Sequence, residues 1–236
     1  MKKEAVILAG GLGTRLRSVV ADVPKCMASV AGKPFLYYLL DFLSQAGFEH
    51  VILSLGYKHE YIENWLKSYS SPMMISSVVE TSPLGTGGGI RLALSKAREE
   101  NVFILNGDTF LNVDYDGMLA LHGKTHAKAT LALKEMHNFD RYGAVEIDIE
   151  SNRIIQFKEK KFCKSGLING GTYLTHKDVL RSYPEKFSLE KDFFEEIISN
   201  SILTGYISRG YFIDIGIPDD YNKAQKDFGD GIYKNL

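Results

Sequence analysis

The feature that most constrains this chain is a short apolar run that ends abruptly in glycines. Residues 5–8 (AVIL) are enough for a buried strand and too few to form a helix on their own. Gly10, Gly11 and Gly13 follow. Glycines after a strand let consecutive backbone N–H groups point outward without a Cβ in the way, and such amides form a concave site for anions. The segment therefore predicts a strand followed by an anion-binding loop.

Two cationic residues follow these glycines and indicate that the bound anion is a phosphate. Arg15 offers a planar fork of donors and Lys25 a compact point charge, and both suit phosphate oxygens. The loop is not a P-loop, because no Lys-Ser or Lys-Thr pair follows the glycines. It is not a dinucleotide fingerprint either, because Leu16 stands where the third glycine should be. A plain glycine turn between a strand and a helix stays open, although such a turn does not need the two cations.

The first half of the chain alternates between strand-like and helix-like segments. The expected strands are 51–55, 75–80 and 102–105, and the expected helices are 35–47, 58–68 and 87–98. Such alternation indicates an α/β protein with a doubly wound, mainly parallel sheet. After Asn106 the segments 129–135, 143–148, 153–158 and 167–175 are strand-like and close together, which predicts antiparallel additions. A helix over 189–200, short strands at 202–208 and 211–215, a helix opening at Pro218 and a frayed end complete one expected domain, 1–236.

Composition excludes several classes of function. The net charge of −1 without a basic run argues against nucleic acid as a partner. No apolar run approaches the ~20 residues of a membrane span, and no charged-then-apolar leader precedes the first strand, so we expect no membrane partner. Two cysteines, Cys26 and Cys163, give no disulfide framework, which favours a cytoplasmic location.

Three candidate functional stretches follow expected strands: residues 10–15, 80–88 and 106–108. Ligands of open α/β sheets bind outside the carboxyl ends of the strands, so we expect a single shared site. Asp108 directly follows an apolar strand, and a carboxylate there can hold Mg²⁺, which bridges phosphate oxygens. The alternative is an Asp that caps the next turn.

The motifs LAGGLGTRL and VPK resemble the signature of the sugar-1-phosphate nucleotidyltransferases, a family that makes nucleotide sugars. The stretches RSVVADVPK, LGTGGGIRLAL and LNGDTF are most similar to the branch of guanylyltransferases for D-glycero-α-D-manno-heptose 1-phosphate. The resemblance covers essentially the whole chain. It implies a Rossmann-like mixed sheet of the nucleotidyltransferase (glycosyltransferase-A-like) fold.

The resemblance assigns the start of the chain to the nucleotide. The implied nucleotide-binding residues are Leu8, Ala9, Gly10, Gly11, Gly13 and Thr14. Arg15 would hold the triphosphate and the leaving group, and Lys25 would neutralise the α-phosphate region. Mg²⁺ would be held by Asp108 and by Asp214 of the DxGxP motif, for which a solvated strand-end acid is the alternative. Arg15, Lys25 and Asp108 are the implied catalytic residues.

A second stretch, ETSPLGTGG, corresponds to the segment that holds the nucleobase in relatives. Its candidate nucleotide-binding residues are Glu80, Pro83, Gly85 and Thr86. An ionised Glu80 only accepts hydrogen bonds, and guanine offers two adjacent donors where uracil and thymine offer one. This match favours GTP, with a surface acid as the other interpretation of Glu80.

Three further segments resemble the sugar-binding half of the family's cleft. The implied sugar-phosphate-binding residues are Gly143, Glu159, Lys160, Asn169 and Gly170. Lys161 replaces the usual Pro after the Glu-Lys pair, and Gly170 replaces the usual Ala of an Asn-Ala-Gly stretch. A solvated, Lys-rich edge is the alternative for the Glu-Lys pair.

The resemblance therefore implies transfer of GMP from Mg·GTP to a sugar 1-phosphate, heptose 1-phosphate being the first choice. Transfer of UMP, dTMP or CMP, or mannose 1-phosphate as the acceptor, stays open. So does a non-catalytic subunit that only senses nucleotide sugars, although Arg15, Lys25, Asp108 and Asp214 are all retained. A homo-oligomer is compatible with the sequence.

Overall fold

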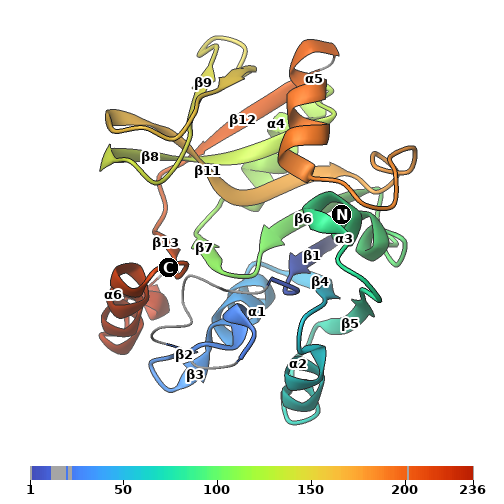
Figure 1. Ribbon diagram of the computed structural model, residues 1–236, viewed down its shortest axis with the longest axis vertical. Helices are drawn as coiled ribbons and strands as arrows, with labels where there is room; N and C mark the ends of the chain where they lie inside the picture. Colours follow the sequence, from blue (N-terminus) through green and yellow to red (C-terminus); the bar gives the residue numbers. More distant parts are fainter. Residues whose placement is uncertain (1, 12–19, 21–22, 201, 236) are drawn as a thin grey trace.

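The computed structural model describes residues 2–11, 20, 23–200 and 202–235, which form a nine-stranded sheet with helices on both faces (Figure 1). The strands along the sheet follow the order β10-β9-β11-β6-β1-β4-β5, and β8 pairs with β11 and with β12. Their bounds are β1 (Lys3–Leu8), β4 (Phe48–Leu55), β5 (Met74–Val79), β6 (Asn101–Asn106), β8 (Ala129–Phe139), β9 (Ala144–Ile147), β10 (Ile154–Phe157), β11 (Cys163–His176) and β12 (Leu203–Ser208).

Parallel pairing joins the first-half strands, as the strand–helix alternation predicts. β1 pairs in parallel with β4 and β6, and β4 with β5. The predicted antiparallel additions are also confirmed, because β11 runs antiparallel to β6, β8 and β9, and β10 to β9. β12 instead runs parallel to β8. The α/β, doubly wound class with a mixed sheet is therefore confirmed.

Helices cover both faces of the sheet because each central strand points apolar side chains alternately to one face and to the other. Ala5 and Ile7 of β1 belong to one buried cluster, and Val6 between them belongs to the other. The first cluster contains side chains of α1 (Phe35–Gln45), α2 (His59–Leu66), α4 (Tyr115–Thr125) and α6 (Pro218–Gly229). The second contains side chains of α3 (Gly85–Leu94), the π-helix η3 (Leu189–Phe194) and α5 (Glu195–Asn200). Strands buried on both sides explain the near-continuous apolar runs of the sequence.

Short elements complete the fold around the ends of the central strands. The 3₁₀-helix η2 (Lys25–Met27) precedes a small hairpin of β2 (Ser29–Val30) and β3 (Lys33–Pro34). β7 (Thr109–Leu111) follows β6 and pairs with β13 (Phe212–Asp214) in a separate two-stranded sheet. This second sheet lies beside the strand ends where the candidate residues gather (Figure 1).

Several boundaries differ from the predictions; for example, β4 begins at Phe48 and β8 extends to Phe139. The helix expected over 87–98 spans Gly85–Leu94, and beyond its end the Glu4 carboxylate accepts hydrogen bonds from the N–H groups of Arg98 and Glu99, at 2.8 and 2.9 Å. The helix expected over 189–200 begins as the π-helix η3. The expected frayed end is wrong: residues Ile232–Asn235 form a 3₁₀-helix, η4, and Tyr233 stacks on Phe228 at 5.6 Å between ring centroids.

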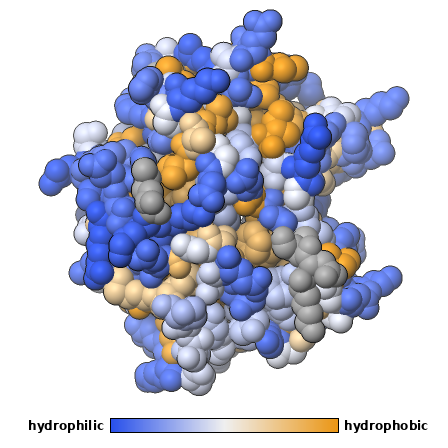
Figure 2. Space-filling model, turned by 180° about the vertical axis from the view of Figure 1, so that it is seen from behind, coloured by the Kyte–Doolittle hydropathy of each residue, from blue (hydrophilic) through white to orange (hydrophobic). Residues whose placement is uncertain are grey.

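On the face opposite to that of Figure 1, hydrophobic side chains show mainly in the upper half, among hydrophilic ones (Figure 2). Exposed hydrophobic residues of the β8–β12 region include Ile149, Ile155 and Phe162, with Ile155 in the edge strand β10. The homo-oligomer stays a prediction. Within the described residues, no helix is both long and apolar enough to cross a membrane.

Candidate active site

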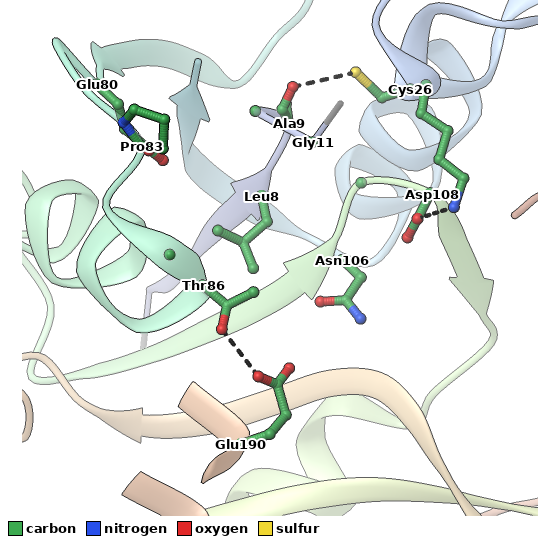
Figure 3. A pocket seen from close by; sticks show the side chains of 14 residues that line it. Leu8, Ala9, Gly11, Cys26, Glu80, Pro83, Thr86, Asn106, Asp108 and Glu190 are labelled. Atoms are coloured by element: carbon green, nitrogen blue, oxygen red, sulfur yellow. Dashed lines mark hydrogen bonds and ion pairs between the residues drawn. The ribbon is translucent and has the colours of Figure 1, made fainter. Parts of the chain in front are cut away.

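Two adjoining cavities open at the carboxyl ends of the central strands. The first, cavity I, has a volume of about 380 Å³ (Figure 3). It is lined by Leu8, Ala9, Gly10, Gly11, Lys25, Cys26, Glu80, Pro83, Gly85, Thr86, Asn106, Gly107, Asp108 and Glu190. Backbone hydrogen bonds from Ala9 N to Ser54 O and from Gly107 N to Leu8 O, both 2.9 Å, hold its floor to the sheet. The three predicted stretches thus meet in one cavity, as far as they lie within the described residues; Gly13, Thr14 and Arg15 lie outside them.

Cys26 closes the cavity beside Lys25 as a small buried side chain, 2% exposed. Burial raises the pKa of its thiol to about 12. It is therefore protonated at neutral pH and poorly suited to nucleophilic chemistry.

Glu80 stands at the end of β5 and closes the turn that leads into α3. Its Oε2 accepts a hydrogen bond from Leu84 N at 3.0 Å, while Oε1 lies against Gly89, where an added Cβ would be 2.5 Å away. The carboxylate thus shapes this turn as well as lining cavity I. Its contact with guanine stays a prediction.

Gly85 and Thr86 fix the start of α3 against the segment before η3. Gly85 has a φ of +75°, and a Cβ there would lie 2.6 Å from Phe187 O, so no other residue fits without strain. Thr86 Oγ1 accepts from Leu189 N and donates to Glu190 Oε2, each at 2.9 Å. Side chains of η3 are thereby held at the edge of cavity I.

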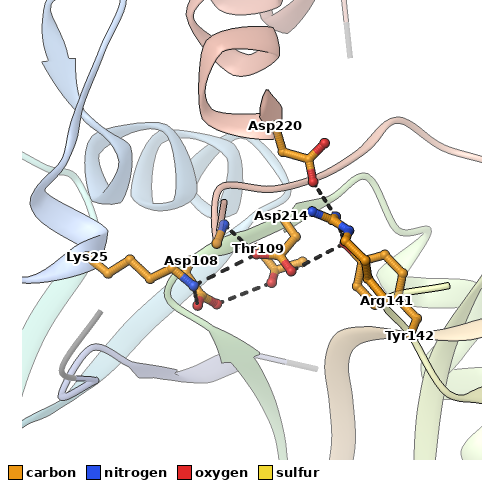
Figure 4. Close-up of polar contacts among 8 residues, drawn as sticks. Lys25, Asp108, Thr109, Arg141, Tyr142, Asp214 and Asp220 are labelled. Carbon is orange, nitrogen blue, oxygen red and sulfur yellow. Dashed lines mark hydrogen bonds and ion pairs between the residues drawn. The ribbon is translucent and has the colours of Figure 1, made fainter. Parts of the chain in front are cut away.

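Lys25, Asp108 and Asp214 meet between the two cavities (Figure 4). The Lys25 ammonium forms an ion pair with Asp108 and lies 3.9 Å from Asp214 Oδ1. The carboxylates are neighbours because Thr109 of β7 pairs with Asp214 of β13. The structure therefore brings together both predicted acids and the predicted lysine.

The carboxylates of Asp108 and Asp214 are close enough to repel each other. Burial, and then the negative charge of Asp108, raise the pKa of Asp214. Gly216 N and Tyr142 OH donate to the Asp214 carboxylate at 2.8 and 3.3 Å and help to keep it ionised. Like charges at such a place favour a cation between them.

The donor set fits Mg²⁺, which prefers oxygen ligands and is commonly bound by one or two carboxylates together with substrate phosphates. No group of three or more His, Cys, Asp or Glu side chains that could hold a metal exists within the described residues. A metal at Asp108 and Asp214 would therefore take its remaining ligands from water and substrate.

Behind Asp214, a short polar network fixes Tyr142. The Arg141 guanidinium donates through Nη2 to Asp220 and, at 2.9 Å, to Tyr142 OH (Figure 4). Arg141 Nη1 is buried and has no partner within the described part of the chain. No pattern in the sequence predicts this network, because its members come from the turn before β9 and from the first turn of α6.

Cavity II, of about 510 Å³, adjoins the acid pair on the other side. It is lined by Lys25, Asn106, Asp108, Thr109, Arg141, Tyr142, Gly143, Phe157, Lys158, Glu159, Lys160, Asn169, Gly171, Tyr173, Glu190, Lys191, Phe194, Glu195, Phe212, Asp214, Gly216 and Ile217. Four of the five predicted sugar-phosphate residues are among them. Asn169 is held in place because its Oδ1 accepts from Gly171 N, at 2.9 Å, and its Nδ2 donates to Tyr173 OH, at 3.2 Å.

Gly170 is the exception, and its role in binding the sugar phosphate stays a prediction. It is buried and does not line cavity II. A Cβ at this position would lie 2.5 Å from Leu111 Cδ2 and 2.9 Å from Ala132 O, so the residue faces packed protein. Adjacent residues of a strand face opposite sides, which sequence resemblance alone does not resolve.

Both cavities share two lining residues that received no individual role from the sequence, Asn106 and Glu190, although Asn106 lies in the predicted stretch 106–108. Asn106 ends β6, two residues before Asp108, so its position was a usable signal. Glu190 lies in η3, far along the chain from the predicted motifs, and no local pattern marks it.

Comparison with known proteins places this geometry among nucleotidyl transferases. The profile of the family described as "Nucleotidyl transferase" matches residues 4–231. A D-glycero-alpha-D-manno-heptose 1-phosphate guanylyltransferase of Aneurinibacillus thermoaerophilus is 50% identical over 95% of this chain and 97% of its own. One of the same name from Campylobacter jejuni is 43% identical over 92% of this chain and 96% of its own. The crystal structure of HddC from Yersinia pseudotuberculosis complexed with GMP-PN matches with a TM-score of 0.87 and 38% identity, over 96% of this chain and 99% of that chain.

Proposed function

The chain belongs to the nucleotidyl transferase family, and from this premise we propose that it transfers GMP from GTP to D-glycero-α-D-manno-heptose 1-phosphate. The products are GDP-heptose, a precursor for surface polysaccharide, and pyrophosphate. The observation that carries the proposal is the meeting of Lys25, Asp108 and Asp214 where cavities I and II join. Two relatives named for this reaction, each covered over nearly its whole length, support the choice of both substrates.

The chemistry needs positioning and charge neutralisation rather than a general base. An oxygen of the acceptor phosphate is already anionic at neutral pH and attacks the α-phosphorus in line. The new P–O bond forms as the bond to the bridging oxygen of pyrophosphate breaks. Repulsion between the two anions is the main obstacle, so cations fixed at the junction supply most of the catalysis.

Each cavity accounts for one substrate. In cavity I, the loop at Gly10 and Gly11 faces the phosphates, and Glu80, Pro83, Gly85 and Thr86 surround the base. In cavity II, Gly143, Glu159, Lys160 and Asn169 face the acceptor, with Lys160 as the partner of its phosphate. Arg15 keeps its assignment to the triphosphate on the sequence motif alone.

Lys25 lines both cavities, which suits a cation that neutralises charge on the α-phosphate as the acceptor approaches. Asp108 and Asp214 are the proposed Mg²⁺ ligands. When bound, the ion supplies charge neutralisation and orientation of the triphosphate. Residues 1–236 act as one nucleotidyltransferase domain in this scheme, in the cytoplasm, where GTP is available.

A pyrophosphate-release assay tests the proposal. GTP, UTP, dTTP and CTP are each paired with heptose 1-phosphate, mannose 1-phosphate and glucose 1-phosphate in the presence of Mg²⁺. We expect the highest kcat/KM for GTP with heptose 1-phosphate. Turnover with a different pair would reassign the substrates, and no turnover with any pair, despite tight binding of a nucleotide sugar, would favour a sensing subunit.

A further inference from the structure

Glu190 occupies the place where the two cavities join, and the scheme above gives it no role. Only four residues line both cavities among those that the structure describes: Lys25, Asn106, Asp108 and Glu190. Lys25 and Asp108 face the phosphates, whereas Glu190 approaches from η3, across cavity I from the glycine loop (Figure 3). A carboxylate therefore stands at the junction, opposite the glycine loop.

This carboxylate is held in a defined position. Its Oε2 accepts from Thr86 Oγ1 at 2.9 Å and from Ser188 Oγ at 3.1 Å. Thr86 Oγ1 also accepts a hydrogen bond from Leu189 N, which links the first turn of η3 to the start of α3. Both contacts of the Glu190 carboxylate use the same oxygen, and Oε1 has no hydrogen bond to any described residue, so it can accept one from a ligand at the junction.

The charge of Glu190 is not paired within the described part of the chain. No Lys, Arg or His of the described segments forms an ion pair with it, although Lys191 follows it in sequence. A carboxylate that is exposed in a cleft for two polyanions repels both of them. A substrate group that donates a hydrogen bond to this carboxylate would offset the repulsion, since an ionised carboxylate can only accept.

Of the groups on the two substrates, phosphates offer no donors at neutral pH, and the base lies at the Glu80 end of cavity I. Sugar hydroxyls remain. We propose that Glu190 accepts a hydrogen bond from a sugar hydroxyl at the junction, on the ribose of the nucleotide or on the acceptor sugar, and thereby selects for that hydroxyl. This inference rests on the proposed function, because it takes the two substrates from there.

A purely local role is the competing explanation. An acidic residue in the first turn of a helix interacts favourably with the helix dipole. Glu190 also accepts hydrogen bonds from the hydroxyls of Ser188 and Thr86, which would stabilise this turn without any ligand. Asp192 offers a matched control, because it accepts from Ser188 N at 2.7 Å in the same turn but lines neither cavity.

The experiment measures kcat/KM for wild type, Glu190→Gln, Glu190→Ala and Asp192→Asn with GTP, 2′-deoxy-GTP and 3′-deoxy-GTP. The same four proteins are also assayed with the acceptor and with its monodeoxy analogues. A hydrogen bond to a charged group predicts that loss of the relevant hydroxyl costs wild type and Asp192→Asn about tenfold to a hundredfold. In Glu190→Ala the same loss should cost less than about threefold, with Glu190→Gln in between.

The two sets of deoxy analogues show which substrate carries the hydroxyl that Glu190 contacts. Coupling of Glu190 to a ribose hydroxyl assigns it to the nucleotide, and coupling to an acceptor hydroxyl assigns it to the sugar. Equal penalties in wild type and Glu190→Ala for every analogue overturn the inference. Calorimetric binding of GTP and its deoxy analogues, and of the acceptor and its analogues, gives the same comparison without turnover. If wild type turns over no substrate pair, only the proposed function fails, and the binding data still decide on Glu190.

Discussion

Thr109 and Asp214 face each other in the antiparallel pair of β7 and β13, and just beside them Ile215 N donates to Asp108 O at 3.0 Å. This register, rather than proximity in sequence, brings the two acids to one place. The Lys25 ammonium lies against both carboxylates. A two-stranded sheet outside the main sheet therefore builds the charged centre of the site.

Removal of either charge should lower turnover strongly without unfolding the protein. Lys25→Ala removes the cation shared by both cavities, and Asp108→Asn removes a proposed metal ligand. The loss of one preorganised electrostatic contact typically costs about 2.7–4 kcal/mol of barrier, so we expect kcat to fall about a hundredfold to a thousandfold. Steady-state kinetics measure the loss, and thermal unfolding checks the fold.

Lys33→Ala is the control for that experiment, because Lys33 lies in β3, at neither cavity, with its ammonium over the Tyr37 ring. It should retain wild-type turnover. A near-normal kcat in Lys25→Ala or Asp108→Asn would contradict the assigned roles.

Tyr142→Phe should weaken metal binding while it leaves the nucleotide contacts intact. The Tyr142 hydroxyl donates a hydrogen bond to Asp214 at 3.3 Å and accepts one from Arg141 Nη2 at 2.9 Å. Partners that orient a metal ligand typically contribute about tenfold to a hundredfold in metal affinity. Titration with Mn²⁺ followed by electron paramagnetic resonance, with GTP present, measures the change. Unaltered Mn²⁺ affinity in Tyr142→Phe would show that Asp214 does not depend on this hydroxyl.

The sequence was informative where function follows from the end of a strand. β1, β5 and β6 each place a predicted residue in cavity I, because carboxyl ends of parallel strands share one edge of the sheet. The apolar runs identified these strands, and glycines and acids directly after them identified the site. Asp214 was predicted from a family motif, but its contact with Asp108 depends on the register of two short strands.

What the sequence could not provide lies in long-range packing. Glu190 reaches the site because Thr86 and Phe187 bind the segment before η3 to the start of α3. Gly170 faces away from cavity II because of the local side-chain alternation in β11. The position of Glu190 has no local signature, since it depends on contacts between residues far apart in the chain. The orientation of Gly170 follows from strand alternation once the bounds and register of β11 are known.

Glu80→Gln tests whether the carboxylate reads guanine. The glutamine carbonyl can keep the bond from Leu84 N, so the turn should persist and the change isolates the charge. If Glu80 accepts both guanine donors, kcat/KM for GTP should fall about tenfold, while UTP and dTTP lose little. An unchanged preference for GTP would remove Glu80 from base recognition and leave it with the role of shaping the turn.

Acid should destabilise the protein partly through His122. Burial, and then the nearby His176, lower the pKa of His122 from 6.5 to about 4. Because the unfolded state then binds the proton more readily, stability is complete above about pH 6.5 and declines as the pH falls toward 4, by about 2–3 kcal/mol from this group. Urea unfolding at several pH values should show a steeper decline in wild type than in His122→Gln, which can keep a bond to Thr130 Oγ1. Equal slopes in the two proteins would exclude His122 as the source.

Two glycine-to-alanine changes should affect stability in opposite directions. At Gly88 in α3, an added Cβ would lie 2.2 Å from Glu185 O and 2.8 Å from Leu84 Cβ, so the segment before η3 must move away. Overpacking of this kind typically costs about 1–3 kcal/mol, and the same shift should weaken nucleotide binding, because Gly85 and Thr86 line cavity I.

At Gly123 in α4, nothing lies within 4 Å of an added Cβ, so alanine should stabilise the helix by about 0.5–1 kcal/mol and leave binding unchanged. Urea unfolding and GTP calorimetry of both variants measure these effects; a Gly88→Ala protein with wild-type stability and GTP affinity would show that α3 and the segment before η3 are not coupled at the site.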